Sequence, residues 1–193
     1  IMVFVRPDVP TEILLYTGAR FPVGVLMNAS EEYPEGYGYT VKKGETIRIL
    51  NTPYEISSNL RSIVKARSTV AKNYDAYNPS IVIYEDLGEE YFSNATQSYQ
   101  NKIYAKSYGF AYSAWAFIQQ AYLALMDLIW QIVYSIVFIT MMLVAFSVLF
   151  ERFVYAKHGP KRIGFLIASL VLMLVFISFF HPGFHIATNA GMS

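Results

Sequence analysis

Two long apolar runs occupy most of the C-terminal half of this 193-residue chain. The second run, from Ile163 to Phe180, contains no charged residue and would measure about 27 Å as a helix, close to the thickness of a bilayer's hydrocarbon core. Pro182 and Gly183 follow the run, where they would end a helix. This pattern predicts a transmembrane helix over residues 163–180, and the alternative is a buried helix of a soluble domain.

The first run, residues 108–150, is about twice as long as one bilayer crossing requires. Asp127 is its only charged side chain, and charged residues follow directly after Phe150. Counting back about twenty residues from that charged end places the outer membrane boundary near Trp130. We therefore expect residues 110–150 to form a stalk followed by a first transmembrane helix.

The segment between the two runs, residues 151–162, sets the expected orientation. It carries four basic side chains and a single acidic one. Short loops with an excess of lysine and arginine stay on the cytoplasmic side of a membrane. We therefore expect a multi-pass protein of the cell membrane, with residues 151–162 in the cytoplasm. Both termini, including the tail at 181–193, are expected outside.

Residues 1–109 have the charge content of a water-facing domain, with eleven basic and twelve acidic side chains. The runs at 12–17, 21–27 and 80–85 are typical of short strands, because they are rich in β-branched and aromatic residues and are bounded by turn residues. Residues 39–50 alternate around a Lys-Lys-Gly-Glu turn, and this pattern predicts a β-hairpin.

Two further stretches of this domain are less regular. Residues 59–70 fit one helical face but are rich in β-branched side chains, so both a helix and a strand remain open, and the neighbouring strands favour a strand. Residues 98–115 alternate aromatic with small or polar side chains around Gly109. The predicted fold is an α+β membrane protein, with an extracytoplasmic β-sandwich-like domain over 1–109 followed by a two-helix transmembrane hairpin whose first helix is long.

The composition agrees with a membrane location and excludes several classes of function. Hydrophobic residues make up 54% of the chain and charged residues 15%, against roughly 25% charged residues in average soluble domains. The net charge of +1 excludes a basic nucleic-acid binder, and the apolar content excludes a disordered chain or a simple soluble domain. The chain has no cysteine, which excludes disulfides, iron–sulfur centres and cysteine nucleophiles. Catalytic triads and phosphate-binding loops are not recognisable, so we expect neither a cofactor nor enzyme activity.

Two groups of residues have the types that metal sites use. His181 and His185 are four residues apart, but a proline and a glycine lie between them and no third ligand is near, so imidazoles facing lipid headgroups are favoured over a metal site. The acidic pairs at 85–86 and 89–90 are interpreted as a solvated acidic loop rather than a calcium site.

The stalk carries apolar side chains in all directions above the expected membrane boundary. Left exposed to water, such a surface would drive aggregation. We therefore expect a second chain, either a copy of this protein or another subunit, to pack against residues 115–131. The residues expected at partner contacts are Trp115, Phe117, Ile118, Tyr122 and Leu125 of the stalk, Asp127 and Gln131 near the boundary, and Gly164 and Ala168 of the second apolar run.

The expectation for Asp127 and Gln131 has open alternatives. Asp127 and Gln131 share a helical face with Gln120, where they would touch water and headgroups, contact a partner helix or line an ion pathway. Gly164 and Ala168 form a pair of small residues that lets two helices approach closely.

Two N-glycosylation motifs lie in the part of the chain that is expected outside the cell. They begin at Asn28 and Asn94, and both are candidate glycosylation sites.

The function predicted from the sequence is that of a non-catalytic accessory or structural subunit of a larger integral membrane complex. Its partners would be the lipid bilayer and other membrane subunits or copies of itself, with no nucleic acid. The alternative is a cell-surface adhesion or receptor-like protein that binds an external ligand through its β-domain. A third hypothesis is a subunit of an enzyme whose partners bind the cofactors.

Overall fold

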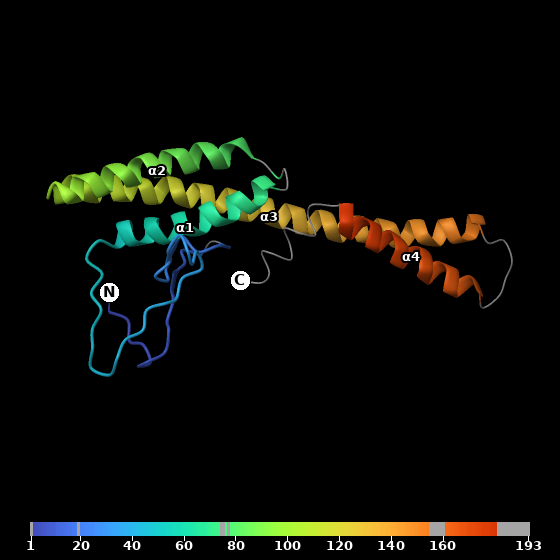
Figure 1. Cartoon of the computed structure of the whole chain (residues 1–193), viewed down its shortest axis with the longest axis horizontal. Helices are drawn as coiled ribbons and strands as arrows, with labels where there is room; N and C mark the ends of the chain where they lie inside the picture. The colour runs from blue at the N-terminus through green and yellow to red at the C-terminus, as the bar shows by residue number, and fades with distance from the viewer. Residues whose placement is uncertain (1, 19, 74–75, 77, 155–160, 181–193) are drawn as a thin grey trace. The chain divides into compact units, whose positions relative to one another are not determined.

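The computed structural model describes residues 2–18, 20–73, 76, 78–154 and 161–180. This part of the chain is mostly helical (Figure 1). Two short strands come first and four helices follow: β1 (Ile13–Leu15), β2 (Gly24–Leu26), α1 (Thr52–Asn73), α2 (Pro79–Gln100), α3 (Tyr104–Val154) and α4 (Lys161–Phe180).

The predicted β-sandwich is wrong. Among the described residues, the strands form one two-stranded antiparallel sheet in which Ile13 pairs with Leu26 and Leu15 with Gly24. This pair confirms the strands expected within 12–17 and 21–27, but the strand expected at 80–85 and the strand favoured at 59–70 are helical, in α2 and α1. The β-domain that the receptor-like alternative would use is therefore not among the described residues.

Helix α2 shows why strand propensity gave the wrong element. Its first turn is rich in β-branched residues, which favour strands when taken alone. The preceding Asn78, however, accepts a hydrogen bond from the Ser80 amide at 3.0 Å, and Pro79 occupies the first helical turn, where its missing N–H costs nothing. The end of α2 closes with hydrogen bonds from the Lys102 amide to the Tyr99 carbonyl and from the Ile103 amide to the Ser98 carbonyl.

The hairpin predicted at 39–50 is wrong as a pair of strands, although its turn forms. The Glu45 amide donates to the Lys42 carbonyl at 3.0 Å, and Gly44 has the positive φ of +82° that the turn requires. Tyr39 pairs instead with Thr11, through reciprocal backbone hydrogen bonds of 2.9 and 3.1 Å. The segment that was expected to pair with its own second half thus pairs with the N-terminal segment.

The chain divides into two compact units. Unit 1 comprises Ile1–Lys72 and Tyr77–Met126, and unit 2 comprises Asn73–Ala76 and Asp127–Ser193. Helix α3 supplies residues to both units.

Unit 1 is built around α1, α2 and the first part of α3, which lie side by side (Figure 1). The buried side of α3 repeats with spacings of four and three residues, a periodicity that keeps one helical face towards its neighbours. Helices α2 and α3 approach closely where Gly88 faces Ile118. A Cβ atom on Gly88 would lie 2.5 Å from Ile118 Cγ1, so only glycine permits this packing. The buried residues of the α3 repeat are Ser107, Ala111, Ala114, Ile118, Ala121 and Leu125.

In unit 2, the later part of α3 packs beside α4 (Figure 1). Ser147 and Glu151, one helical turn apart, are buried, and the Ser147 hydroxyl donates to the Met173 sulfur at 3.8 Å. Within the described residues, one helix, Tyr104–Phe153, is long and apolar enough to cross a membrane. The multi-pass prediction is therefore corrected from two candidate crossings to one. It relied on the charge-free run at 163–180, and the length and apolar content of a run do not by themselves show that a helix crosses a membrane.

Candidate interaction surfaces

The five stalk residues expected to meet a partner belong to the packed part of unit 1. Ile118 and Leu125 are 2% and 0% exposed, and Tyr122 is also buried. The Trp115 indole N–H donates to the Val23 carbonyl at 2.8 Å, while the Phe117 ring stacks on Tyr91 with a centroid distance of 5.4 Å. The chain's own helices and N-terminal segment therefore cover the surface for which we expected a second chain.

The remaining residues expected at partner contacts lie in unit 2 and are exposed. Asp127 and Gln131 are exposed on α3, near an aromatic pair of Trp130 and Tyr134 whose ring centroids are 5.8 Å apart. Gly164 and Ala168 are exposed on α4, and a Cβ on Gly164 would meet no atom within 4 Å. The small pair is thus available for close contact but does not make one within the described structure.

Asn59 fastens the chain that follows β2 onto α1. Its side-chain oxygen accepts from the amides of Met27 and Ala29 at 3.3 and 2.7 Å, and its Nδ2 donates to the Glu55 carbonyl at 2.6 Å. The Tyr39 hydroxyl also contacts the Asn59 side chain. Asn59 is 2% exposed, so each of these bonds replaces one that water could otherwise make.

Burial changes the pKa of two groups near Asn59, the Glu55 carboxyl and the Tyr39 hydroxyl. Burial raises the pKa of the Glu55 carboxyl, although Glu55 lies in the first turn of α1, where a carboxylate is usually favoured. Burial also raises the pKa of the Tyr39 hydroxyl, and the nearby Glu55 charge adds to that rise. These polar groups fit a role in holding the N-terminal segment on α1.

Ion pairs join the segment at 31–35 to α1. Lys65 Nζ lies 2.9 Å from Glu31 Oε1, Arg61 lies 3.6 Å from the same oxygen, and Arg67 lies 2.8 Å from Glu35. The hydrogen bond from Lys65, followed by the charges of Lys65 and Arg61, lowers the pKa of the Glu31 carboxyl.

A second set of ion pairs joins α1 to α2 and corrects the predicted acidic loop. Arg61 also pairs with Glu89, and Lys72 lies 3.3 Å from Glu85, which additionally accepts from the Ser68 hydroxyl. Both glutamates lie on α2 rather than in a loop. No group of three or more histidine, cysteine or acidic residues in the described structure is arranged to hold a metal. His181 and His185 lie outside the described residues.

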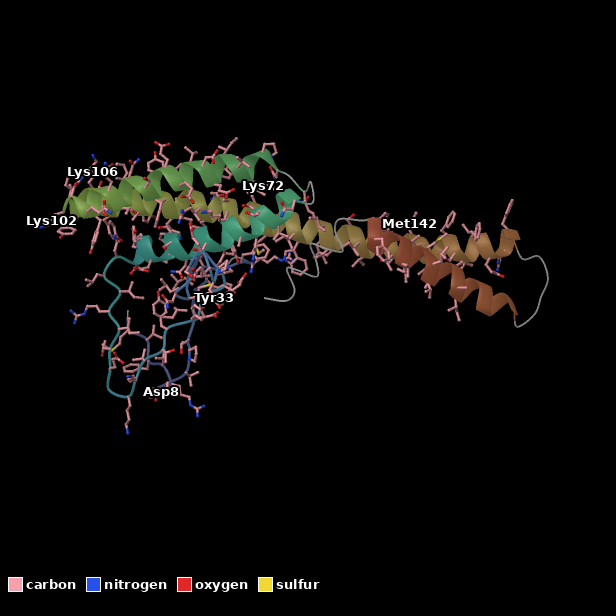
Figure 2. The ribbon with its side chains drawn as sticks, in the orientation of Figure 1. Asp8, Tyr33, Lys72, Lys102, Lys106 and Met142 are labelled. Carbon is pink, nitrogen blue, oxygen red and sulfur yellow. The ribbon has the colours of Figure 1, made fainter. Side chains whose placement is uncertain are left out.

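The turn between α2 and α3 carries an exposed aromatic and basic surface, which we name the tyrosine–lysine tip. Figure 2 shows Lys102 and Lys106 together at this turn. The sequence contains no acidic residue between Glu90 and Asp127, so no carboxylate of the hairpin neutralises the tip. The tip comprises Tyr99, Lys102, Ile103, Tyr104, Lys106 and Tyr108, and its tyrosines and isoleucine are 50–60% exposed.

The sequence could have indicated part of this arrangement. The spacing of small residues along 107–121 is a helical packing signal, and the Asn78–Pro79 pair is a helix start signal. Asn59 and Gly88, in contrast, acquire their roles only from partners that are distant in the sequence. No family model, curated protein or solved structure matches this chain.

Proposed function

We propose that the chain is a non-catalytic structural subunit of a larger integral membrane assembly, anchored by α3 and carrying unit 1 outside the cytoplasm. The observation that carries this proposal is the exposure of the later part of α3. In the most apolar 18-residue window of this helix, only 6% of residues are buried. A core helix of a soluble protein would bury most of such a window, so lipid or apolar protein is the environment that suits it.

The exposed side chains of this part of α3 support the anchor. Trp130 and Tyr134 stand at the end nearer unit 1 in the sequence, as expected of side chains at a membrane interface. The large apolar side chains that follow are exposed between residues 137 and 150: Val137, Phe138, Met141, Met142, Val144, Phe146, Val148, Leu149 and Phe150.

The orientation rests on the charges that follow α3's apolar part. Residues 151–162 hold four basic side chains, which favour the cytoplasmic side, and unit 1 would then lie outside. Because the chain has no cysteine, single cysteines report on each side without background. A cysteine at Ser93 should react with an impermeant maleimide in intact cells, and one at Ala156 should react only after permeabilisation. The reverse pattern would overturn the orientation.

The tyrosine–lysine tip is the surface where we place the contact with another subunit. Lipid can cover the apolar part of α3, but the tip belongs to unit 1, where its tyrosines are exposed. Exposed tyrosines are enriched at protein interfaces, because each offers apolar area and a polar hydroxyl at a small entropic cost.

The experiment is purification from native membranes in a mild detergent, followed by native mass spectrometry. We expect a fixed set of other integral membrane proteins to accompany the chain. The variant Y104S/Y108S should lose at least one of them, while S93A/Q97A, on the exposed face of α2, should keep all of them. A clean monomer of the unmodified chain would contradict the proposal.

A further inference from the structure

Unit 1 contains two glycosylation motifs, which lie in different local structures. Asn28–Ala29–Ser30 lies in the irregular segment after β2, whereas Asn94–Ala95–Thr96 lies within α2. A glycan is bulky and hydrated, so its acceptor must stand in a solvent-exposed segment. The two motifs therefore offer a matched comparison within one domain.

The backbone around Asn28 turns its side chain outward. The amides on both sides, of Met27 and Ala29, point inward to the Asn59 side chain at 3.3 and 2.7 Å. Asn28 itself has a φ of +56°, a left-handed conformation that asparagine tolerates better than most residues. Asn28 is exposed, as is Ser30.

In the motif at Asn94, the two residues that follow the asparagine, Ala95 and Thr96, both contact other parts of unit 1. Ala95 is 0% exposed, and its carbonyl accepts from the Ser107 hydroxyl of α3 at 2.9 Å. The Thr96 hydroxyl donates to the Phe92 carbonyl at 3.0 Å and lies 3.1 Å from the Tyr54 hydroxyl of α1. A transferase could reach this motif only before α2 forms and packs.

We infer that Asn28 is a site of N-linked glycosylation and that Asn94 is not modified. The donor is an oligosaccharide linked to a polyprenyl diphosphate. The bond between the first sugar's C1 and the phosphate oxygen breaks, Asn28 Nδ2 forms a bond to C1, and an amide proton leaves with the released diphosphate. The inference rests on the proposed function, because such donors and their transferases act outside the cytoplasm.

The test uses the full chain, expressed in a eukaryotic cell line and digested with an N-glycosidase. We expect the enzyme to remove the mass of one glycan from the unmodified chain and from N94Q. It should remove none from N28Q or S30A. Peptide mass spectrometry should then place the glycan on Asn28.

An introduced third motif shows whether a negative result concerns Asn28 alone or the proposed location of unit 1 outside the cytoplasm. The K43N/E45T variant introduces a motif into the exposed turn at 42–45, and we expect it to carry two glycans. If only the introduced motif is modified, the assignment to Asn28 is wrong, and if Asn94 carries a glycan, the inference that Asn94 is not modified is wrong. In both cases unit 1 is still outside. If no motif is modified, unit 1 does not enter the glycosylating compartment, and both the site and the proposed orientation fail.

Discussion

The two parts of α3 are similarly poor in charge but differ in what surrounds them. Between Lys106 and Glu151, the only charged side chain of this helix is Asp127. In unit 1, small residues at 111, 114 and 121 are fully buried and let neighbouring helices approach. In unit 2, large apolar side chains are exposed on most of the helix surface between 137 and 150. Apolar content alone therefore does not show whether a stretch of helix packs against its own chain, whereas the burial of its side chains does.

The largest effect should come from a charge in the packed part of α3. Ile118→Asp places a carboxylate in an apolar core, at a position where the side chain is 2% exposed. We expect unit 1 to lose more than about 4 kcal/mol of stability, because an unpaired buried charge is among the most costly changes known. Limited proteolysis should show unit 1 degraded while Ile118→Val, which costs about 0.5–1.5 kcal/mol, remains resistant. A protease-resistant Ile118→Asp protein would mean that this face is not buried.

An arginine placed on the exposed surface of α3 should distinguish its part in unit 1 from its part in unit 2. Met141→Arg places a charge near the centre of the expected membrane span and should cost about 2.5–3.5 kcal/mol of insertion free energy. Ala116→Arg, on the exposed side of α3 in unit 1, should change insertion and folding by less than about 0.5 kcal/mol. Alkaline carbonate extraction measures the difference. Equal extraction of the two variants would remove the distinction between the two parts of the helix.

Substitutions of two glycines test how closely α2 and α3 pack in unit 1. Gly88→Ala introduces a Cβ 2.5 Å from Ile118 Cγ1, and we expect a loss of about 1–3 kcal/mol, as for other overpacked contacts. Gly109→Ala meets no atom within 4 Å and should gain up to about 1 kcal/mol from helix propensity. Thermal melting of the detergent-solubilised variants gives both values. Opposite signs are the expected result, and a stabilising Gly88→Ala would refute the close approach of α2 and α3.

The smallest expected effect concerns the pH dependence of the contact between α1 and the N-terminal segment. Because burial raises the pKa of Glu55, the folded state binds a proton there more tightly than the unfolded state does, so ionisation of this group lowers stability as the pH rises above 4.5. Glu55→Gln should therefore raise the melting temperature at pH 7, and the gain should disappear as the pH falls below 4.5. Glu90→Gln is the matched control, because it makes the same substitution at an exposed position. A lower melting temperature of Glu55→Gln at pH 7 would contradict the burial effect.

The sequence predicted the apolar helix that ends after Phe150 because this depends on local composition, whereas the start of α3 lies in the stretch 98–115, which was expected to be part of the β-domain. The charge-free stretch before Phe150 indicated a helix too long for one crossing, and α3 is continuous from Tyr104 to Val154. The two strands of the small sheet were also predictable, because each is a short β-branched run set apart by a glycine turn.

The rest could not be predicted in the same way, because it depends on contacts between distant segments. Residues 59–70 fit both elements, and what makes them helical in the structure is packing of one face in a core shared with β2 and α3. Tyr39 pairs with Thr11 rather than within its own hairpin. The stalk was expected to need a partner because nothing in its sequence shows that Gly88 leaves room for Ile118.

The most direct test of the account measures what surrounds each part of α3 in a bilayer. Single cysteines carrying nitroxide labels at Tyr112 and Ala116, and at Phe138 and Met142, can be compared in reconstituted vesicles, since the chain has no other cysteine. We predict that labels at 138 and 142 collide with oxygen and are shielded from a water-soluble nickel chelate, while labels at 112 and 116 show the opposite preference. Free access of the chelate to 138 and 142 would contradict the claim that the later part of α3 anchors the protein in a membrane.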